Sequence, residues 1–359
     1  MPKVYRYPRS GIIIEARSRY WVLSGKSRRR HFLKQEYYLK VIRWGIIGCG
    51  SVTEVKSGPG FQKANHSELV AVMRRDAAKA KDYAQRHQVP KHYQDSQQLI
   101  QDPDVDAVYI ATPPHLHHDY VLEVASAGKP VYVEKPMALN TKQCQAMITA
   151  CEQANIPLYV AYYRRALPRF LSIKSLLETG AIGKVRAVTI TYTRPFNHDP
   201  EQPLPWRVIP EISGGGFFMD LACHTLDYLD FMLGPIVKVN GHCANQSNAY
   251  PAEDAVCASF VFASGVQGTG LWSFNSFERQ DRTEIIGSKG KLIFSSFGTE
   301  PVQLITKTGE QKFPIDNPEH VQQPLIQTIV NQLNGIGQCT STGTSAARTA
   351  WVMDQILQS

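Results

Sequence analysis

An acid, a histidine and a lysine are placed in this chain so that they could transfer a proton to or from an alcohol or carbonyl group. Asp220 and His224 lie four residues apart, so on a helix they share one face. A histidine is the usual general acid or base near neutral pH, and glycines at 214–216 precede the pair, where they would allow a close backbone approach. Lys135 follows a short apolar segment, where an ammonium group could donate a proton or stabilise an alkoxide. The alternatives are a core histidine capped by a carboxylate and a surface lysine in a turn.

A glycine pair indicates where a dinucleotide could bind. Gly48 and Gly50 stand between an apolar segment at 41–47 and a segment that could form a helix. Glycines there let the backbone approach a pyrophosphate, which the N–H groups of the helix N-terminus would bind. Thr53 occupies the third glycine position of this fingerprint. The motif predicts a dinucleotide site, with an ordinary glycine turn as the alternative.

Two arginines follow the second predicted strand. NAD enzymes usually carry Asp or Glu at this point, where it binds the ribose hydroxyls. Arg74 and Arg75 would instead attract the 2′-phosphate of NADP. Asp76 is a competing acid, which could cap the next helix. We predict that NADP(H) is preferred and NAD(H) is possible, with a solvated basic turn as the alternative.

Side chains that suit a hydroxyl-rich ring occur in two further places. Arg164 and Arg165 follow the last strand of the first half, and Trp206 and Arg207 lie in a proline-rich loop. A packing tryptophan and solvated arginines are the alternative. The histidines at 115, 117 and 118 have no Cys or carboxylate at metal-ligand spacing, so we predict no metal site.

Alternating strands and helices must position these groups. Strand-like segments at 41–47, 69–73, 105–111 and 131–133 alternate with helical segments at 77–87, 117–127 and 141–155. From about residue 165, strand-like segments dominate, at 185–193, 237–243, 256–262, 266–274, 283–286 and 291–294, with helices expected at 216–233 and 346–357. The pattern predicts an α/β protein: a Rossmann-type doubly wound parallel sheet followed by an α+β domain with a large, mostly antiparallel open sheet.

This pattern divides the chain into three parts. We expect a basic leader at 1–40, a nucleotide-binding domain at 41–163, and a substrate-binding and dimerisation domain at 164–359. Segment 266–274 has small or apolar residues on both faces. Helices can cover only one of them, so the segment predicts a homodimer or homotetramer formed through the other.

The composition excludes several classes of protein. The formal net charge is +8, but eleven of the 39 Lys and Arg residues and only two of the 31 acids lie within 1–40. The body is therefore nearly neutral, and we expect no nucleic-acid binding. No apolar run is long enough for a membrane span. Seven scattered cysteines without C-x-x-C spacing indicate a reducing, cytoplasmic compartment.

The leader contains a segment, 29–34, that resembles a twin-arginine export signal. Such a signal needs an uncharged apolar segment after it, and charged residues follow here. We therefore expect a disordered tail or a misassigned start rather than an export signal.

Taken together, the motifs resemble those of the Gfo/Idh/MocA family (glucose–fructose oxidoreductase, inositol dehydrogenase and rhizopine-catabolism proteins). The resemblance runs from about residue 41 to the C-terminus. It departs from the family pattern at Thr53, Ala222 and Tyr163. The motifs that carry it are Gly48-Cys49-Gly50, Thr112-Pro113-x-x-x-His117, Gly128-Lys129-Pro130, Glu134-Lys135-Pro136, Trp206-Arg207 and Gly214-Gly215-Gly216-x-x-x-Asp220-x-x-x-His224-x-x-Asp227.

The resemblance implies an NAD(P)-dependent oxidoreductase that transfers a hydride to or from a sugar, sugar derivative or cyclitol. It implies proton transfer by His224, substrate orientation by Asp220 and electrostatic support by Lys135, and it leaves open whether Lys135 or His224 is the principal acid or base. Arg164, Trp206 and Arg207 would join Asp220 and His224 in binding substrate. The expected cofactor contacts are Gly48, Cys49, Gly50, Ser51, Val52, Arg74, Arg75, Thr112, Pro113, His117, Glu134 and Lys135. A redox-type glycosidase with a tightly bound, recycled cofactor and a non-catalytic nucleotide or sugar sensor are the alternatives.

Overall fold

The first half of the chain forms a parallel sheet. The computed structural model describes residues 39–358, so the predictions for the leader fall outside the described residues. Six strands pair in the order β3-β2-β1-β4-β5-β6, and all of these pairs are parallel. Their bounds are β1 Ile42–Ile47, β2 Ser67–Met73, β3 Lys91–Tyr93, β4 Ala107–Ile110, β5 Val131–Val133 and β6 Leu158–Val160. The strand order reverses between β1 and β4, which is where open α/β sheets bind ligands.

Helices connect these strands. They are the π-helix η1 (Thr53–Ser57), α1 (Gly58–Lys63), α2 (Ala77–Arg86), α3 (Ser96–Gln101), η2 (Pro114–Leu116), α4 (His117–Ser126) and α5 (Thr141–Gln153). Side chains cap three of them, because Asp76, Asp95 and Asn140 each accept a backbone N–H in the first turn of α2, α3 and α5. The cap at Asp76 is the one expected from the sequence.

The second half contains an open sheet of eight strands. The order is β14-β13-β12-β11-β7-β10-β9-β8, and every pair is antiparallel except β7 with β10. The bounds are β7 Val185–Thr193, β8 Ile236–Ala244, β9 Ala255–Phe262, β10 Gln267–Ser273, β11 Gln280–Gly287, β12 Gly290–Phe294, β13 Val302–Thr306 and β14 Gly309–Phe313. The predicted fold class is confirmed.

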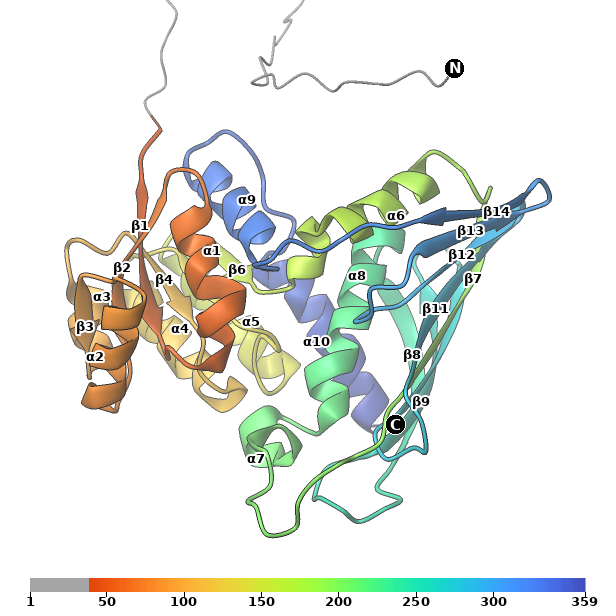
Figure 1. Ribbon diagram of the computed structural model, residues 1–359, viewed down its shortest axis with the longest axis horizontal. Helices are drawn as coiled ribbons and strands as arrows, with labels where there is room; N and C mark the ends of the chain where they lie inside the picture. Colours follow the sequence, from red (N-terminus) through yellow and green to blue (C-terminus); the bar gives the residue numbers. More distant parts are fainter. Residues whose placement is uncertain (1–38, 359) are drawn as a thin grey trace, which may run out of the picture. The chain divides into compact units, whose positions relative to one another are not determined.

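Helices of the second half cover one face of this sheet. The helices of this half are η3 (Tyr163–Ala166), α6 (Pro168–Glu178), η4 (Trp206–Val208), α7 (Pro210–Ser213), the π-helix η5 (Phe218–Ala222), α8 (Cys223–Leu233), α9 (Gln323–Leu333) and α10 (Gly343–Gln358). Figure 1 shows α6, α8 and α10 on the side of the eight-stranded sheet that faces the six-stranded sheet. None of the helices in residues 39–358 is long and apolar enough to cross a membrane.

The last two helices return to the first half. α9 contacts α1 and η3, and α10 packs against α5 as well as β8. The end of the predicted second domain therefore packs against both halves of the chain.

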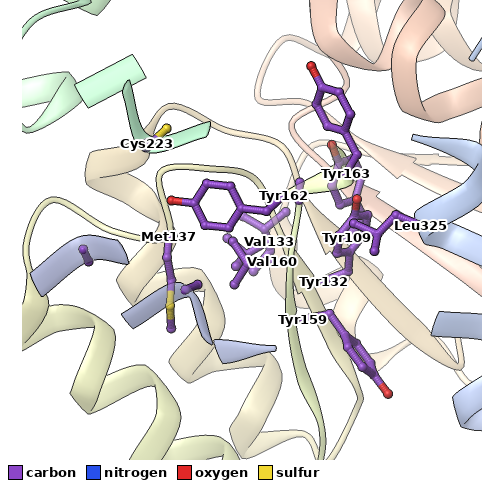
Figure 2. Packing of buried hydrophobic residues seen from close by; sticks show 14 of the residues in the cluster. Tyr109, Tyr132, Val133, Met137, Tyr159, Val160, Tyr162, Tyr163, Cys223 and Leu325 are labelled. Carbon is purple, nitrogen blue, oxygen red and sulfur yellow. The ribbon is translucent and has the colours of Figure 1, made fainter. Parts of the chain in front are cut away.

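Aromatic residues fill the core where the halves meet. The rings of Tyr109 and Tyr132 stack with centroids 4.7 Å apart, and the Tyr132 hydroxyl donates to Gln322 Oε1 at 2.8 Å. Figure 2 shows Tyr162 and Tyr163 pointing to opposite sides of the chain, with Tyr162 on the side of Cys223 and Met137. This alternation buries one ring in the core and turns the other toward the cavity described below.

A buried ion network joins three elements. Arg165 of η3 donates to both carboxylate oxygens of Asp227 at 2.8 Å, and to Asp230 Oδ1 at 3.0 Å. Arg348 of α10 donates to Asp230 at 2.7 Å. Arg165, Asp227 and Asp230 are almost wholly buried. The network therefore fixes η3, α8 and α10 to one another.

Candidate active site

A cavity of about 900 Å³ lies at the carboxyl ends of β1, β2, β4 and β5. Side chains of both halves line it, among them Lys135, Asp220 and His224. The lining also includes Gly48, Cys49, Gly50, Ser51, Val52, Lys56, Arg74, Arg75, Thr112, Pro113, Tyr120, Glu134, Tyr163, Trp206, Arg207, Leu221, Phe297 and Gln322.

The glycine loop leaves room for a phosphate group. Gly48 has φ +91°, and a Cβ there would lie 2.8 Å from Thr112 Cγ2, whereas a Cβ on Gly50 would meet nothing closer than 3.9 Å. Thr53, in the third glycine position, is wholly buried and donates to the Gly50 carbonyl at 2.8 Å. The buried hydroxyl of Thr112 has no hydrogen-bond partner among residues 39–358. An open loop beside an unpaired hydroxyl fits a dinucleotide phosphate.

The arginines after β2 lie at the same end of the cavity. Arg74 Nη1 donates to the Cys49 carbonyl at 3.1 Å, so its guanidinium lies against the glycine loop. Arg75 is exposed at the cavity edge. Asp76 also lines the cavity, but its carboxylate accepts from the Lys79 backbone N–H at 3.1 Å and pairs with the Lys79 ammonium group at 3.3 Å. The position of a ribose-binding acid is therefore taken by a cation.

Lys135, Asp220 and Arg207 form a charged chain across the cavity. Lys135 Nζ donates to Asp220 Oδ1 at 2.7 Å and to its carbonyl at 2.8 Å, and Arg207 Nε lies 3.2 Å from Asp220 Oδ2. Burial alone would lower the pKa of Lys135, but Asp220 outweighs it and raises that pKa well above its ordinary value. Burial likewise opposes ionisation of Asp220, yet Lys135 and Arg207 lower the net pKa. Both groups are therefore charged at neutral pH.

His224 stands beside this chain as a neutral group. It is 3% exposed, and its Nδ1 has no hydrogen-bond partner within residues 39–358. Burial, with the charges of Arg164 and Lys135, lowers its pKa well below the ordinary value. The rings of Tyr163 and Phe297 lie 5.2 and 6.0 Å from it.

Two π-helical turns face the cavity. Asp220 lies in η5 and Lys56 in η1, and each turn runs directly into an α-helix. Such turns are rare and are frequent at functional sites. The i, i+4 spacing of Asp220 and His224 therefore begins in a widened turn, but both side chains still reach one cavity.

Glu134 lines the cavity with its hydrogen bonds already made. Its Oε1 accepts from Tyr109 Oη and Gln322 Nε2, both at 2.6 Å, and its Oε2 accepts from the Lys135 backbone N–H at 3.0 Å. The carboxylate therefore holds Lys135 in place more than it reaches into the cavity.

Two predicted ligand contacts are corrected by the structure. Arg164 does not line the cavity, because its Nε donates to the Ser296 carbonyl at 3.0 Å and its guanidinium packs 4.6 Å from the Phe297 ring centroid. His117 is also outside the lining. It is wholly buried, with its ring nitrogens 2.8 and 3.0 Å from the carbonyls of Thr112 and Pro136. Both residues position cavity segments from behind.

The glycines at 214–216 include one at which another backbone segment comes close, as the sequence led us to expect. Gly216 N–H donates to Glu253 Oε1 at 2.8 Å, and a Cβ on Gly216 would lie 2.8 Å from the Glu253 carbonyl. The close backbone approach is therefore to Glu253, within the protein.

Several residues of the cavity were not assigned roles from the sequence, among them Lys56, Tyr163, Phe297 and Gln322. Gln322 and Phe297 come from distant segments with no motif of their own. Tyr163 was visible only as a departure from the family pattern. Burial raises the pKa of Tyr163, but the charges of Arg164 and Lys56 outweigh it and the net pKa is lowered.

Comparison with known proteins agrees with this geometry. Residues 42–162 match the family model described as "Oxidoreductase family, NAD-binding Rossmann fold", and residues 170–293 match "GFO/IDH/MocA C-terminal domain". The chain is 40% identical over 316 residues to Oxidoreductase P35 of Formosa agariphila, covering 87% of this chain and 97% of that protein. It is 28% identical over 308 residues to 1,5-anhydro-D-fructose reductase of Ensifer adhaerens, covering 84% and 91%.

A solved structure supports the fold. The structure of levoglucosan dehydrogenase in complex with NADH and levoglucosan matches with a TM-score of 0.78 and 24% identity, covering 88% of this chain and 96% of that one. The two family models, the P35 relative and the cavity residues agree, so this chain belongs to the Gfo/Idh/MocA family of oxidoreductases.

Proposed function

We propose that this enzyme transfers a hydride between a nicotinamide dinucleotide and a carbinol carbon of a sugar, sugar derivative or cyclitol. The observation that carries the proposal is the meeting of Lys135, Asp220 and His224 with the glycine loop in one cavity. The relatives named as a 1,5-anhydro-D-fructose reductase and a levoglucosan dehydrogenase support a sugar-like substrate.

His224 and Lys135 have different roles in the proposed reaction. A bound nicotinamide would supply the hydride acceptor or donor. The neutral imidazole of His224 takes the proton of the carbinol hydroxyl during oxidation, because a base must be unprotonated to act. Lys135 stays charged and stabilises the developing alkoxide with the N–H that Asp220 leaves unused. Asp220 fixes the ammonium group and orients a substrate hydroxyl.

Arg74 and Arg75 select the cofactor. Both line the cavity beside the glycine loop, and the one carboxylate that lines the cavity next to them, that of Asp76, is engaged by Lys79. We propose that they bind the 2′-phosphate and that NADP(H) is preferred over NAD(H).

A substrate panel tests the proposal. Sugars, polyols and cyclitols are assayed with both oxidised and both reduced nicotinamide dinucleotides, and turnover is followed by nicotinamide absorbance. Net oxidation or reduction of at least one compound is the expected result. Glycoside cleavage without net absorbance change would indicate the redox-type glycosidase instead, and tight binding of cofactor and sugar without any conversion would indicate a sensor.

A further inference from the structure

The reacting end of the cavity has one cation without a partner. The charged side chains there are Lys56, Lys135, Arg207, Glu134 and Asp220. Asp220 lies between Lys135 and Arg207, and Glu134 is held by hydrogen bonds within the protein. No carboxylate of residues 39–358 lies within 4.0 Å of the Lys56 ammonium group.

The position of Lys56 is held by the chain that precedes α9. The Lys56 carbonyl accepts from the Gln322 backbone N–H at 3.2 Å, and the Val55 carbonyl lies 2.7 Å from His320 Nδ1. The exposed ammonium group is near enough to the reacting groups that its charge lowers the pKa values of Asp220, Tyr163 and His224. Lys56 therefore places its charge where substrate would lie.

Arg207 offers unused donors on the other half of the protein. Its Nε is 3.2 Å from Asp220, whereas its two terminal nitrogens have no hydrogen-bond partner among residues 39–358. The guanidinium lies 4.4 Å from the centroid of Trp206, and the side chain is 40% exposed. A stacked guanidinium with free terminal nitrogens is suited to a carboxylate or phosphate.

We propose that the substrate is an anionic sugar, whose carboxylate or phosphate ester is bound by Lys56 together with the terminal nitrogens of Arg207. The inference rests on the proposed function and names the substrate class of the same site. An anionic group would supply the counter-charge that Lys56 lacks among residues 39–358, whereas a neutral sugar would not.

Matched substrate pairs test the inference. Each neutral aldose is compared with its uronic acid and its 6-phosphate, by kcat/KM in the wild-type enzyme and in the Lys56→Met and Lys56→Arg variants. We expect one anionic member to exceed its neutral counterpart by about tenfold or more, which is the usual scale of one charge-assisted hydrogen bond. Lys56→Met should reduce that ratio by about tenfold, and Lys56→Arg should restore part of it.

Lys81→Met is the matched control. Lys81 is exposed on α2, makes no ion pair among residues 39–358 and lies outside the cavity lining, so its loss removes the same charge without touching the site. This variant should leave the ratio of anionic to neutral turnover unchanged. Comparison of kcat/KM for the uronic acids and for the 6-phosphates shows which anionic group is bound.

Three outcomes would overturn the inference. The first is a wild-type preference for the neutral member of every pair. The second is an equal loss with both members in Lys56→Met. The third is a weakening of cofactor binding by that variant as large as the loss in turnover, because Lys56 would then belong to the cofactor phosphates. If no sugar is turned over, the proposed function fails, and calorimetric titration of a uronate and its neutral counterpart into the enzyme with cofactor still decides whether the anion is preferred.

Discussion

At the scale of single residues, the cavity holds one titratable group that is neutral at neutral pH, His224, and one that stays charged, Lys135. Lys135 is held in its charged form by Asp220, and His224 is kept neutral by burial among cations. The family resemblance leaves open which of the two is the principal acid or base. Their environments favour His224 as the base in alcohol oxidation, with Lys135 as the electrostatic partner.

The proposed role of His224 predicts a pH profile. The pKa of His224 is lowered, so the neutral base should persist below pH 6.5 and kcat/KM for oxidation should fall only as the pH drops through that lower value. His224→Ala should lower turnover by about a hundredfold or more and remove this acid limb, while the cofactor Kd measured by fluorescence titration stays close to wild type. Near-normal turnover, or an unchanged limb in the variant, would contradict the assignment.

The proposed role of Arg74 predicts a change in cofactor preference. A phosphate clamp contributes about 1.5–3 kcal/mol, so the wild-type enzyme should bind NADP(H) roughly ten- to hundredfold more tightly than NAD(H). Arg74→Asp should weaken NADP(H) binding and leave NAD(H) nearly unchanged, as measured by titration of both cofactors. Arg75→Ser is the comparison at the exposed neighbour and should have the smaller effect. Equal weakening of both cofactors by Arg74→Asp would instead indicate that Arg74 supports the glycine loop through the Cys49 carbonyl.

At the scale of elements, buried charges fix the helices that carry the site. Arg165 of η3 binds Asp227 and Asp230 of α8, and α8 begins with the turn that contains His224. The same arginine follows the cavity residue Tyr163 by two positions. The network therefore sets the distance between the two walls of the reacting end.

The network predicts a large loss of stability when its central cation is removed. Arg165→Met should lower the free energy of unfolding by about 3–5 kcal/mol, because two buried carboxylates lose their shared partner. Arg348→Met is the comparison and should cost less, since this side chain is 41% exposed and Asp230 keeps Arg165 as a partner. Urea unfolding of both variants measures the difference. Similar small losses in the two would show that the Arg165 network does not hold η3 and α8 together.

At the scale of the whole molecule, one face of the eight-stranded sheet has no cover within residues 39–358. Its central strand β10 turns Thr269 and Leu271 outward, opposite Ser259 and Cys257 of β9, while Trp272 is buried on the helix side. Leu271 is 46% exposed. A broad face of small and apolar side chains is typical of an interface between subunits.

Because of this face, we still expect a homodimer or homotetramer. Leu271→Arg should shift the mass measured by light scattering at micromolar concentration toward the monomer. Leu171→Arg is the control, because Leu171 is similarly exposed but lies on α6, on the other side of the sheet. A monomeric wild-type protein, or dissociation by both variants alike, would contradict an interface at this sheet.

The sequence predicted many of the elements and missed others. The alternation of apolar strands and helices predicted four of the six strands of the first sheet, β1, β2, β4 and β5, and β7 was predicted with its observed bounds, whereas β3, β6, β13 and α9 were given no segment. β14 was missed, because its residues are polar and mostly exposed. Arg164 was expected at the ligand because it follows the last strand of the first half, and His117 because of its motif. Neither a position in the sequence nor a motif shows on which side of the backbone a side chain lies. Lys56 lies at the cavity because its turn is π-helical, and Gln322 lies there because the chain before α9 packs against the first half. No local sequence pattern predicts either feature.

The segment before α9, which packs back against the first half, also has a consequence for folding during translation. N-terminal segments generally begin to fold as they leave the ribosome, but Gln322, which bonds Tyr132 and Glu134, is translated 190 residues after Tyr132. α9 covers α1 only then, with Ile326 against Gly60. During that interval the emerging first half presents an apolar helix face and an unfinished cavity wall. We therefore expect a C-terminal truncation that removes Gln322 and α9 to destabilise the domain that is translated first, because that domain loses these contacts.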